Sequence, residues 1–264
     1  MKANRFNGLI IGMVFFTYLW SVPQIIQGEM KDFHKTKASS QDQSETIKIQ
    51  YEEIKEKEPE YEIDIKIPSI KGMKDDVFQV KFNYGMKAKA KKKIDEFKKE
   101  AIQFAREQEQ KGQPLRPFQL HIQPVVKKKG EFISVLNESF IYKGGANGIQ
   151  KVQTLNILND EQAKKLAFSD IFREESKYKY VINDFIKQAI EERRNKGEVF
   201  FEGEEGFQSV TENQSFYFED RQLVVVFDEY EIAPGAMGTP SFQISLEKIK
   251  DLIKPEIYKA VLDS

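Results

Sequence analysis

Residues 118–158, FQLHIQPVVKKKGEFISVLNESFIYKGGANGIQKVQTLNIL, decide the fold because they hold three apolar-rich runs separated by two glycine-bearing turns. The first run, 118–126, and the second, 132–142, flank KKKG, and the third, 149–158, follows GGANG. Runs of this length joined by short glycine turns are typical of consecutive antiparallel strands. We therefore expect a β-meander at the centre of the fold.

Upstream of the meander the sequence predicts a hairpin and then a long helix. Apolar residues alternate over 47–51 and over 61–67, on either side of the charged turn KEKEPE, and Pro68 is expected to end the second strand. The helical stretch that follows has Gly85 as a point of interruption and Gly112 as its expected C-terminal cap. One apolar stripe on it, which predicts packing on a sheet, comprises Ile94, Phe97, Ala101, Phe104 and Ala105.

Downstream of the meander, apolar residues recur at helical spacing from Tyr178 to Ile190 and predict a second amphipathic helix. A further hairpin is expected at 216–218 and 223–227, around EDRQ. Ser245 is expected to cap a C-terminal helix that runs through Ile253. The predicted fold class is α+β: an antiparallel sheet packed with two long amphipathic helices, behind an N-terminal transmembrane anchor.

Composition excludes several kinds of site. The 264 residues include no cysteine and only two histidines, which argues against disulfides, thiolate metal sites and Ser-His-Asp chemistry. The 41 basic and 42 acidic residues leave a net charge of −1, so no overall basic field is present to hold nucleic acid. We expect no cofactor, no metal and no nucleic-acid partner.

The N-terminus predicts a membrane anchor. The 19 residues from Gly8 to Ile26 carry no charge, and as a helix they would reach about 28 Å, roughly the thickness of a bilayer core. Because Lys2 and Arg5 precede them, the positive-inside rule predicts a cytoplasmic tip at 1–7, an anchor at 8–27 and an extracellular remainder. A cleaved signal peptide, and hence a secreted protein, is the alternative.

Two further local features have competing interpretations. Residues 28–45 are polar and irregular and are interpreted as a flexible stalk. Seven lysines between 87 and 99 form a basic helix face, which is either solvated or in contact with anionic lipid or wall polymer.

The acidic cluster Asp228, Glu229 and Glu231 is the one feature that suggests an enzyme. Paired carboxylates can divide into acid and base for glycoside hydrolysis. Alternation along a strand, however, would send Asp228 and Tyr230 to one side and Glu229 and Glu231 to the other. The cluster therefore predicts no catalytic pair.

Two glycine-rich turns, GGANG at 144–148 and APGAMG at 233–238, each follow an aromatic strand. Glycines there permit the positive φ of sharp turns, and neither segment matches a phosphate-binding or dinucleotide fingerprint. The second turn is either a recognition loop that displays Met237 or a tight internal turn in which Met237 fills the core.

The chain resembles an extracellular family of domains of unknown function found in RsiV-type anti-sigma factors, which sense lysozyme, and in PdaC-type peptidoglycan deacetylases. The matching motifs are IPSIKG, YKGGANG, LAFSDIF, FYF with LVVVFDEYEIAPGAMG, and SFQISLEKIKDLIK, in family order from about 46 to 254. Asn147 stands where the family usually has histidine. The resemblance implies an α+β ectodomain with an N-terminal half at 46–158 and a C-terminal half at 159–264.

The same resemblance implies affinity for lysozyme or cell-wall material, without the sigma-binding and deacetylase domains of the two named types. We expect a membrane-anchored extracellular binding module that recognises a protein partner or a wall component, and not an enzyme. A glycan-active enzyme and an accessory subunit of another membrane protein are the alternatives. The residues expected to bind the partner are Tyr142, Gly144, Gly145, Asn147, Tyr230, Pro234, Gly235 and Met237.

Overall fold

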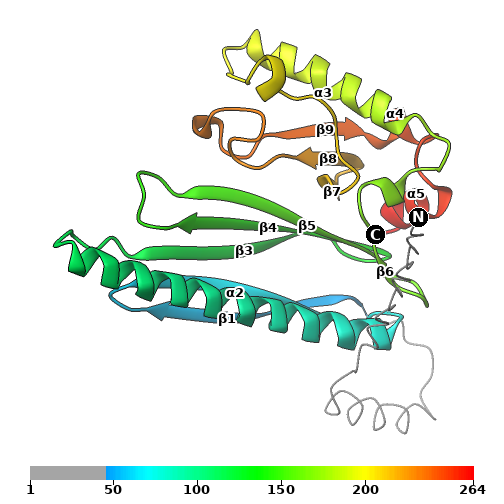
Figure 1. The fold of residues 1–264 in the computed structure, drawn as a ribbon. Helices are drawn as coiled ribbons and strands as arrows, with labels where there is room; N and C mark the ends of the chain where they lie inside the picture. Colours follow the sequence, from blue (N-terminus) through cyan, green and yellow to red (C-terminus); the bar gives the residue numbers. More distant parts are fainter. Residues whose placement is uncertain (1–45) are drawn as a thin grey trace, which may run out of the picture. The chain divides into compact units, whose positions relative to one another are not determined.

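Two β-sheets form the framework of residues 46–264, the part of the chain that the computed structural model describes (Figure 1). The first has the strand order β1-β2-β3-β4-β5-β6, with bounds β1 Lys48–Lys57, β2 Tyr61–Lys71, β3 Phe118–Lys128, β4 Phe132–Tyr142, β5 Ile149–Leu158 and β6 Lys164–Lys165. The second sheet contains β7 Ser215–Glu219, β8 Gln222–Val226 and β9 Ser241–Ser245. The predicted hairpins and the central meander are confirmed.

One strand pair corrects the expectation of a wholly antiparallel sheet. β2 and β3 are parallel, with Tyr61 opposite Phe118 and Ile65 opposite Ile122. Helix α2 (Asp76–Gln110) connects them, and its 35 residues span about 50 Å, enough to carry the chain back to the end of the sheet where β2 began. Because β3 then starts at the same end of the sheet as β2, the two strands run in parallel. Parallel neighbours need a crossover connection of this kind. The first sheet is therefore mixed, and the remaining strand pairs named above are antiparallel.

Helix α2 is continuous. Asp75 caps it by accepting a hydrogen bond from Phe78 N at 2.8 Å, and Gly112, with φ +61°, follows its end as expected. Gly85 does not interrupt it, because one glycine costs only about 1 kcal/mol in a helix whose apolar face is packed. The stripe of Ile94, Phe97 and Ala101 is buried against the strands below it.

Pro68 does not end β2, contrary to the sequence-based expectation. The strand continues to Lys71, and Pro68 lies opposite Tyr51 of β1. The pairing of β2 with β3 stops at Ile65, so beyond that point β2 has a neighbouring strand on one side only. A proline, which cannot donate a backbone hydrogen bond, is tolerated in such a position.

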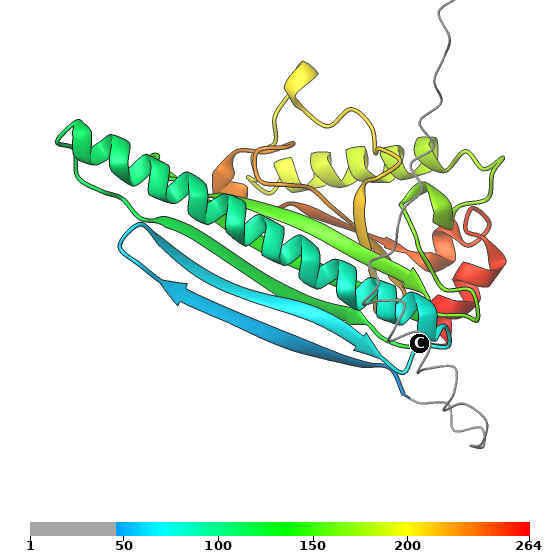
Figure 2. The same cartoon turned by 60° about the horizontal axis from the view of Figure 1, so that its bottom comes forward.

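The elements stack in four layers: α2, the first sheet, the second sheet and α3 (Tyr178–Arg194) (Figures 1 and 2). Alternation along β4 turns Val135 toward the α2 side and Leu136 toward the second sheet, where Leu136 and Val152 pack against Val224. On the outer face of the second sheet α3 buries Ile182, Ile186 and Ile190, which confirms the predicted amphipathic helix. The predicted single sheet is therefore two sheets packed face to face.

The C-terminus also differs from expectation. The predicted helix from Ser245 is a short helix α4 (Leu246–Ile249), which ends before a second one, α5 (Pro255–Leu262). Ser245 is the last residue of β9 and its side chain makes no capping hydrogen bond. Pro255 is compatible with the first turn of a helix but not with its interior, so it divides the segment in two.

The predicted cytoplasmic tip, anchor and stalk, 1–7, 8–27 and 28–45, lie outside the described residues. Within residues 46–264, no helix is both long and apolar enough to cross a membrane.

Candidate surface for partner binding

The turn between β4 and β5 is held from below by aromatic rings. Gly144 has φ +75°, and a β-carbon added there would lie 2.6 Å from the ring of Phe104 on α2. A β-carbon added to Gly148 would likewise lie 2.2 Å from the ring of Phe140. Both glycines are therefore required by close packing, and at Gly144 the backbone conformation requires glycine as well.

The tip of this turn is exposed and internally bonded. Tyr142 Oη donates to the carbonyl of Gly145 at 2.9 Å, and Arg116 Nη1 reaches the same oxygen at 3.3 Å. Asn147 lies exposed at the tip. Next to it Ile149, the first residue of β5, leaves 45% of its surface in solvent. The turn thus presents a braced backbone with an apolar side chain beside it.

The second predicted segment is a turn where the sequence suggested a strand. β8 ends at Val226, and Tyr230 adopts φ +66° in the turn that follows. The alternation expected for Asp228, Glu229 and Glu231 is therefore wrong, because these residues do not lie on an extended backbone.

The three carboxylates bind backbone amides. Asp228 Oδ1 accepts a hydrogen bond from Val152 N at 2.8 Å, and Glu229 Oε2 accepts one from Gln150 N at 2.6 Å. Glu231 Oε2 accepts one from Asp228 N at 2.7 Å, within the turn itself. Desolvation raises the pKa of Glu231. Since β6 pairs only with the last two residues of β5, the amides at 150 and 152 lie on an open strand edge, and the first two acids fasten the turn to it.

The APGAMG segment forms a short 3₁₀ turn, Gly235–Met237, between Pro234 and Gly238. Gly235 lies under the ring of Tyr230, since an added β-carbon would be 2.3 Å from Tyr230 Oη. Met237 is half-buried and packs against the core between the second sheet and α3. This placement favours the internal-turn interpretation for Met237 itself.

Gln150 joins the two turns. Its backbone amide donates to Glu229 Oε2, and its carbonyl accepts from Glu229 N at 3.3 Å. Its side-chain oxygen is 4.0 Å from the position that a β-carbon on Gly238 would occupy. The two glycine turns predicted separately therefore form one continuous surface.

We call this the turn surface, and its exposed members include Gly145, Asn147, Ile149, Gln150 and Tyr230. The other predicted residues, Tyr142, Gly144, Pro234, Gly235 and Met237, are half-buried and support it. Sequence reasoning missed Ile149, although an apolar residue directly after a glycine turn was a signal for it. It also missed Gln150, for which the local sequence carried no signal. Within residues 46–264 no group of three His, Cys, Asp or Glu side chains could hold a metal ion.

Comparison with known families matches this architecture in two segments. Residues 54–150 match the family described as deacetylase PdaC, and residues 169–247 match a family described as a protein of unknown function, DUF3298. The first match contains the glycine turn at 144–148, and the second contains the turn at 233–238. The resemblance to RsiV-like and PdaC-like proteins is confirmed.

Two curated relatives are similar to this chain. The anti-sigma-V factor RsiV of Bacillus subtilis (strain 168) is 27% identical over 220 residues, which are 80% of this chain and 72% of that protein. The peptidoglycan-N-acetylmuramic acid deacetylase PdaC of the same organism is 24% identical over 177 residues, 67% of this chain. The chain spans only 37% of the length of that deacetylase.

Solved structures share the fold. A DUF3298 family member from Bacteroides fragilis superposes with a TM-score of 0.66 at 17% identity, over 84% of this chain and 100% of that one. A DUF3298 family protein from Pseudomonas aeruginosa gives a TM-score of 0.53 at 14% identity, over 81% and 97%. At these identities the likeness supports the α+β architecture alone.

Proposed function

We propose that this protein is a membrane-anchored extracellular binding module that recognises a protein of the lysozyme type through the turn surface. The similarity to the anti-sigma-V factor RsiV, together with the resemblance to lysozyme-sensing proteins, supports this class of partner. The uncharged segment at 8–27, preceded by Lys2 and Arg5, supports the location.

The observation that carries the proposal is the fastening of two distant loops into one surface by Gln150 and Glu229. Residues 79 positions apart in sequence are held together there, and Tyr230 and Ile149 stand beside the junction with 48% and 45% of their surfaces exposed. Exposed aromatic and aliphatic side chains on a rigid support are typical anchors of protein interfaces. Tyr230 also has a left-handed backbone conformation, which residues with a β-carbon rarely adopt. Strained conformations of this kind are often found at binding sites.

A wall glycan is the alternative ligand, and hydrolysis is the alternative activity. Three carboxylates could have supported hydrolysis: Asp228, Glu229 and Glu231. Each accepts a hydrogen bond from a backbone amide, and these bonds hold the turn in place. A binding role is therefore the function that we propose for this region.

The test compares two exposed tyrosines in the full chain. Tyr230→Ala should weaken binding to a lysozyme-type protein, measured by calorimetry, by about tenfold or more, because a tyrosine that anchors an interface contributes more than about 1.4 kcal/mol. Tyr180→Ala is the matched control, since Tyr180 is 75% exposed on α3, away from the turn surface.

Unchanged binding by Tyr230→Ala, or an equal loss in Tyr180→Ala, would rule out the turn surface as the recognition site. Purified peptidoglycan is offered to the same proteins in a separate titration. If the wild-type chain binds peptidoglycan and no lysozyme-type protein, the proposed partner class is wrong.

A further inference from the structure

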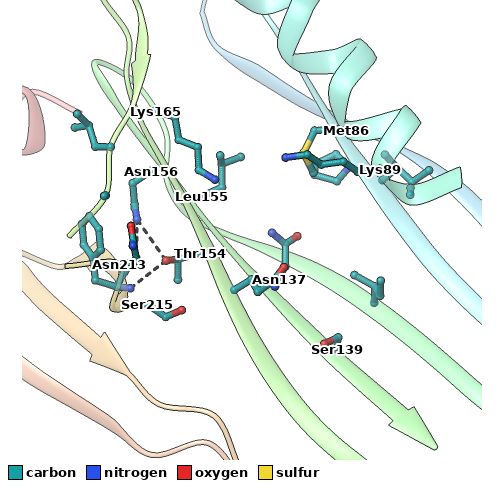
Figure 3. A pocket seen from close by; sticks show the side chains of 18 of the residues that line it. Met86, Lys89, Asn137, Ser139, Thr154, Leu155, Asn156, Lys165, Asn213 and Ser215 are labelled. Atoms are coloured by element: carbon teal, nitrogen blue, oxygen red, sulfur yellow. Dashed lines mark hydrogen bonds between the residues drawn. The ribbon is translucent and has the colours of Figure 1, made fainter. Parts of the chain in front are cut away.

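A cleft of about 690 Å³ opens on the side of the first sheet that carries α2 (Figure 3). Helix α2 packs chiefly over β2, and near its start Phe78 and Phe82 also cover Val135 and Leu155 of β4 and β5. Further along β4 and β5, the same face of the sheet is open. The cleft extends from the helix across these strands to the open edge of β5, where Asn213 and Ser215 form the far wall. Its volume is in the range of small-molecule sites, about 300–1,000 Å³.

The floor of the cleft is polar where the same strands are apolar further along. On β4, Asn137 and Ser139 follow Val135 on one face, and on β5 Gln153 precedes Leu155 on that face. Val135 and Leu155 are paired and buried, with Leu155 at the edge of the cleft, and the next pair, Asn137 and Gln153, forms its polar floor. The core under α2 therefore ends at this point, and the sheet presents amides instead.

These amides have unused hydrogen-bonding capacity. The side chains of Asn137, Gln153 and Asn213 make no hydrogen bond within residues 46–264. A carboxamide offers both donors and an acceptor, which suits ligand hydroxyl groups.

Lysines line the walls. Lys89 and Lys93 come from one face of α2, and Lys165 comes from β6 on the opposite wall (Figure 3). None of the three has an ion-pair partner among the described residues, although many other lysines of the chain do. Asp170 is the one carboxylate in the lining, and it accepts a hydrogen bond from Ala167 N at 2.8 Å.

The lysines raise the electrostatic potential of the cleft. Burial lowers the pKa of Lys93, and the ammonium of Lys151 lowers it further. Burial likewise lowers the pKa of Lys165, and Lys89 adds to this effect. Ammonium groups that repel one another across a partly desolvated space would be stabilised by an anion placed between them.

We propose that this cleft binds an anionic saccharide, with its carboxylate or phosphate between Lys89, Lys93 and Lys165 and its hydroxyls on the amides of Asn137 and Gln153. Lysines alone would suit any anion, but the free amides of the floor favour a ligand that also carries hydroxyl groups. The site shares none of the exposed members of the turn surface, and it does not depend on the function proposed for that surface.

The test titrates the full chain with four probes: tetragalacturonate, glucose 6-phosphate, neutral maltotetraose and a tetraglutamate peptide. Tetragalacturonate or glucose 6-phosphate should bind, and the difference between them distinguishes a sugar carboxylate from a sugar phosphate. Maltotetraose should bind at least about tenfold more weakly, and added NaCl should weaken the binding of the anionic probe. Equal binding of maltotetraose, tighter binding of the glutamate peptide, or no binding of either anionic probe would overturn the proposal.

The variants locate the site. Lys89→Gln combined with Lys93→Gln should weaken binding of the anionic probe by roughly tenfold or more. Lys91→Gln combined with Lys92→Gln is the matched control, because these lysines lie on the same helix and do not line the cleft. Equal losses in the two double variants, or none in the first, would place the anion elsewhere.

A second comparison separates this site from the turn surface. Tyr230→Ala should leave binding of the anionic probe unchanged, and the Lys89 and Lys93 double variant should leave binding of the lysozyme-type protein unchanged. Circular dichroism spectra and melting temperatures of all variants confirm that each is folded.

Discussion

At the scale of single residues, left-handed backbone marks the two turns that form the turn surface. Tyr230 holds φ +66°, a conformation that costs a residue with a β-carbon about 1–2 kcal/mol, while Gly144 holds φ +75° without that cost. Gly144 must be glycine for a second reason, because the ring of Phe104 fills the space of a side chain. Gly145 has open space around it and serves as an internal comparison.

Gly144→Ala should therefore destabilise the protein by about 1–3 kcal/mol, since it combines a strained φ with a clash against Phe104. Gly145→Ala should change the free energy of unfolding by no more than about 0.5 kcal/mol. Urea denaturation of both variants measures the difference. Equal stabilities would show that the Phe104 ring moves freely aside and that the turn is not braced from below.

At the scale of elements, the stripe on α3 divides into residues that are core and residues that flank it. Ile182 and Ile186 are completely buried, whereas Phe185 is half-buried, with the ammonium of Lys248 5.5 Å from the centre of its ring. Periodicity places all three on one face but does not rank them. The centre of the stripe carries most of the energy of packing against the second sheet.

Ile186→Ala should cost about 2–5 kcal/mol, because it leaves a cavity between α3 and the second sheet. Phe185→Ala should cost less, since part of its ring is already in solvent and the site can relax. The check is the shift of the urea midpoint at constant m-value. A larger loss at Phe185 than at Ile186 would contradict the packing described for α3.

At the scale of the whole molecule, buried polar side chains link the two sheets. Asn156 on β5 accepts a hydrogen bond from Ser134 Oγ at 2.5 Å and donates one to the carbonyl of Phe216 on β7 at 2.8 Å. Ser134 Oγ in turn accepts from Phe218 N at 3.3 Å. Around this network Leu136 and Val152 pack against the second sheet, so the two sheets should lose structure together.

Asn156→Ala should lower the free energy of unfolding by about 2–4 kcal/mol, because it leaves the buried Phe216 carbonyl without its partner. Asn137→Ala, on the opposite face of the same sheet, should have little effect, since that side chain makes no hydrogen bond in the described part of the chain. Unfolding of the wild-type protein, followed by circular dichroism and tyrosine fluorescence, should show one transition. Two separate transitions would mean that the sheets are energetically independent.

The local sequence determined most of the elements of this protein. Alternating and helical periodicities place the strands from Lys48 to Leu158 and helix α3, and the glycines at 112, 144 and 238 mark turns whose positive φ values the structure contains. Each of these features depends on residues a few positions apart, which is why a sequence alone reveals them.

Only the tertiary structure decided how these elements meet. The parallel pairing of β2 with β3, the division into two sheets and the fastening of Glu229 to Gln150 all depend on contacts between distant residues. In the sequence the acids at 228 and 229 suggested a catalytic cluster, yet in the structure they accept hydrogen bonds from free backbone amides on the edge of β5. That edge is open because β6 is only two residues long. The cleft beside α2 also depends on tertiary packing, because contacts between layers set the position at which the helix stops covering the sheet. That position produces no periodic pattern in the sequence.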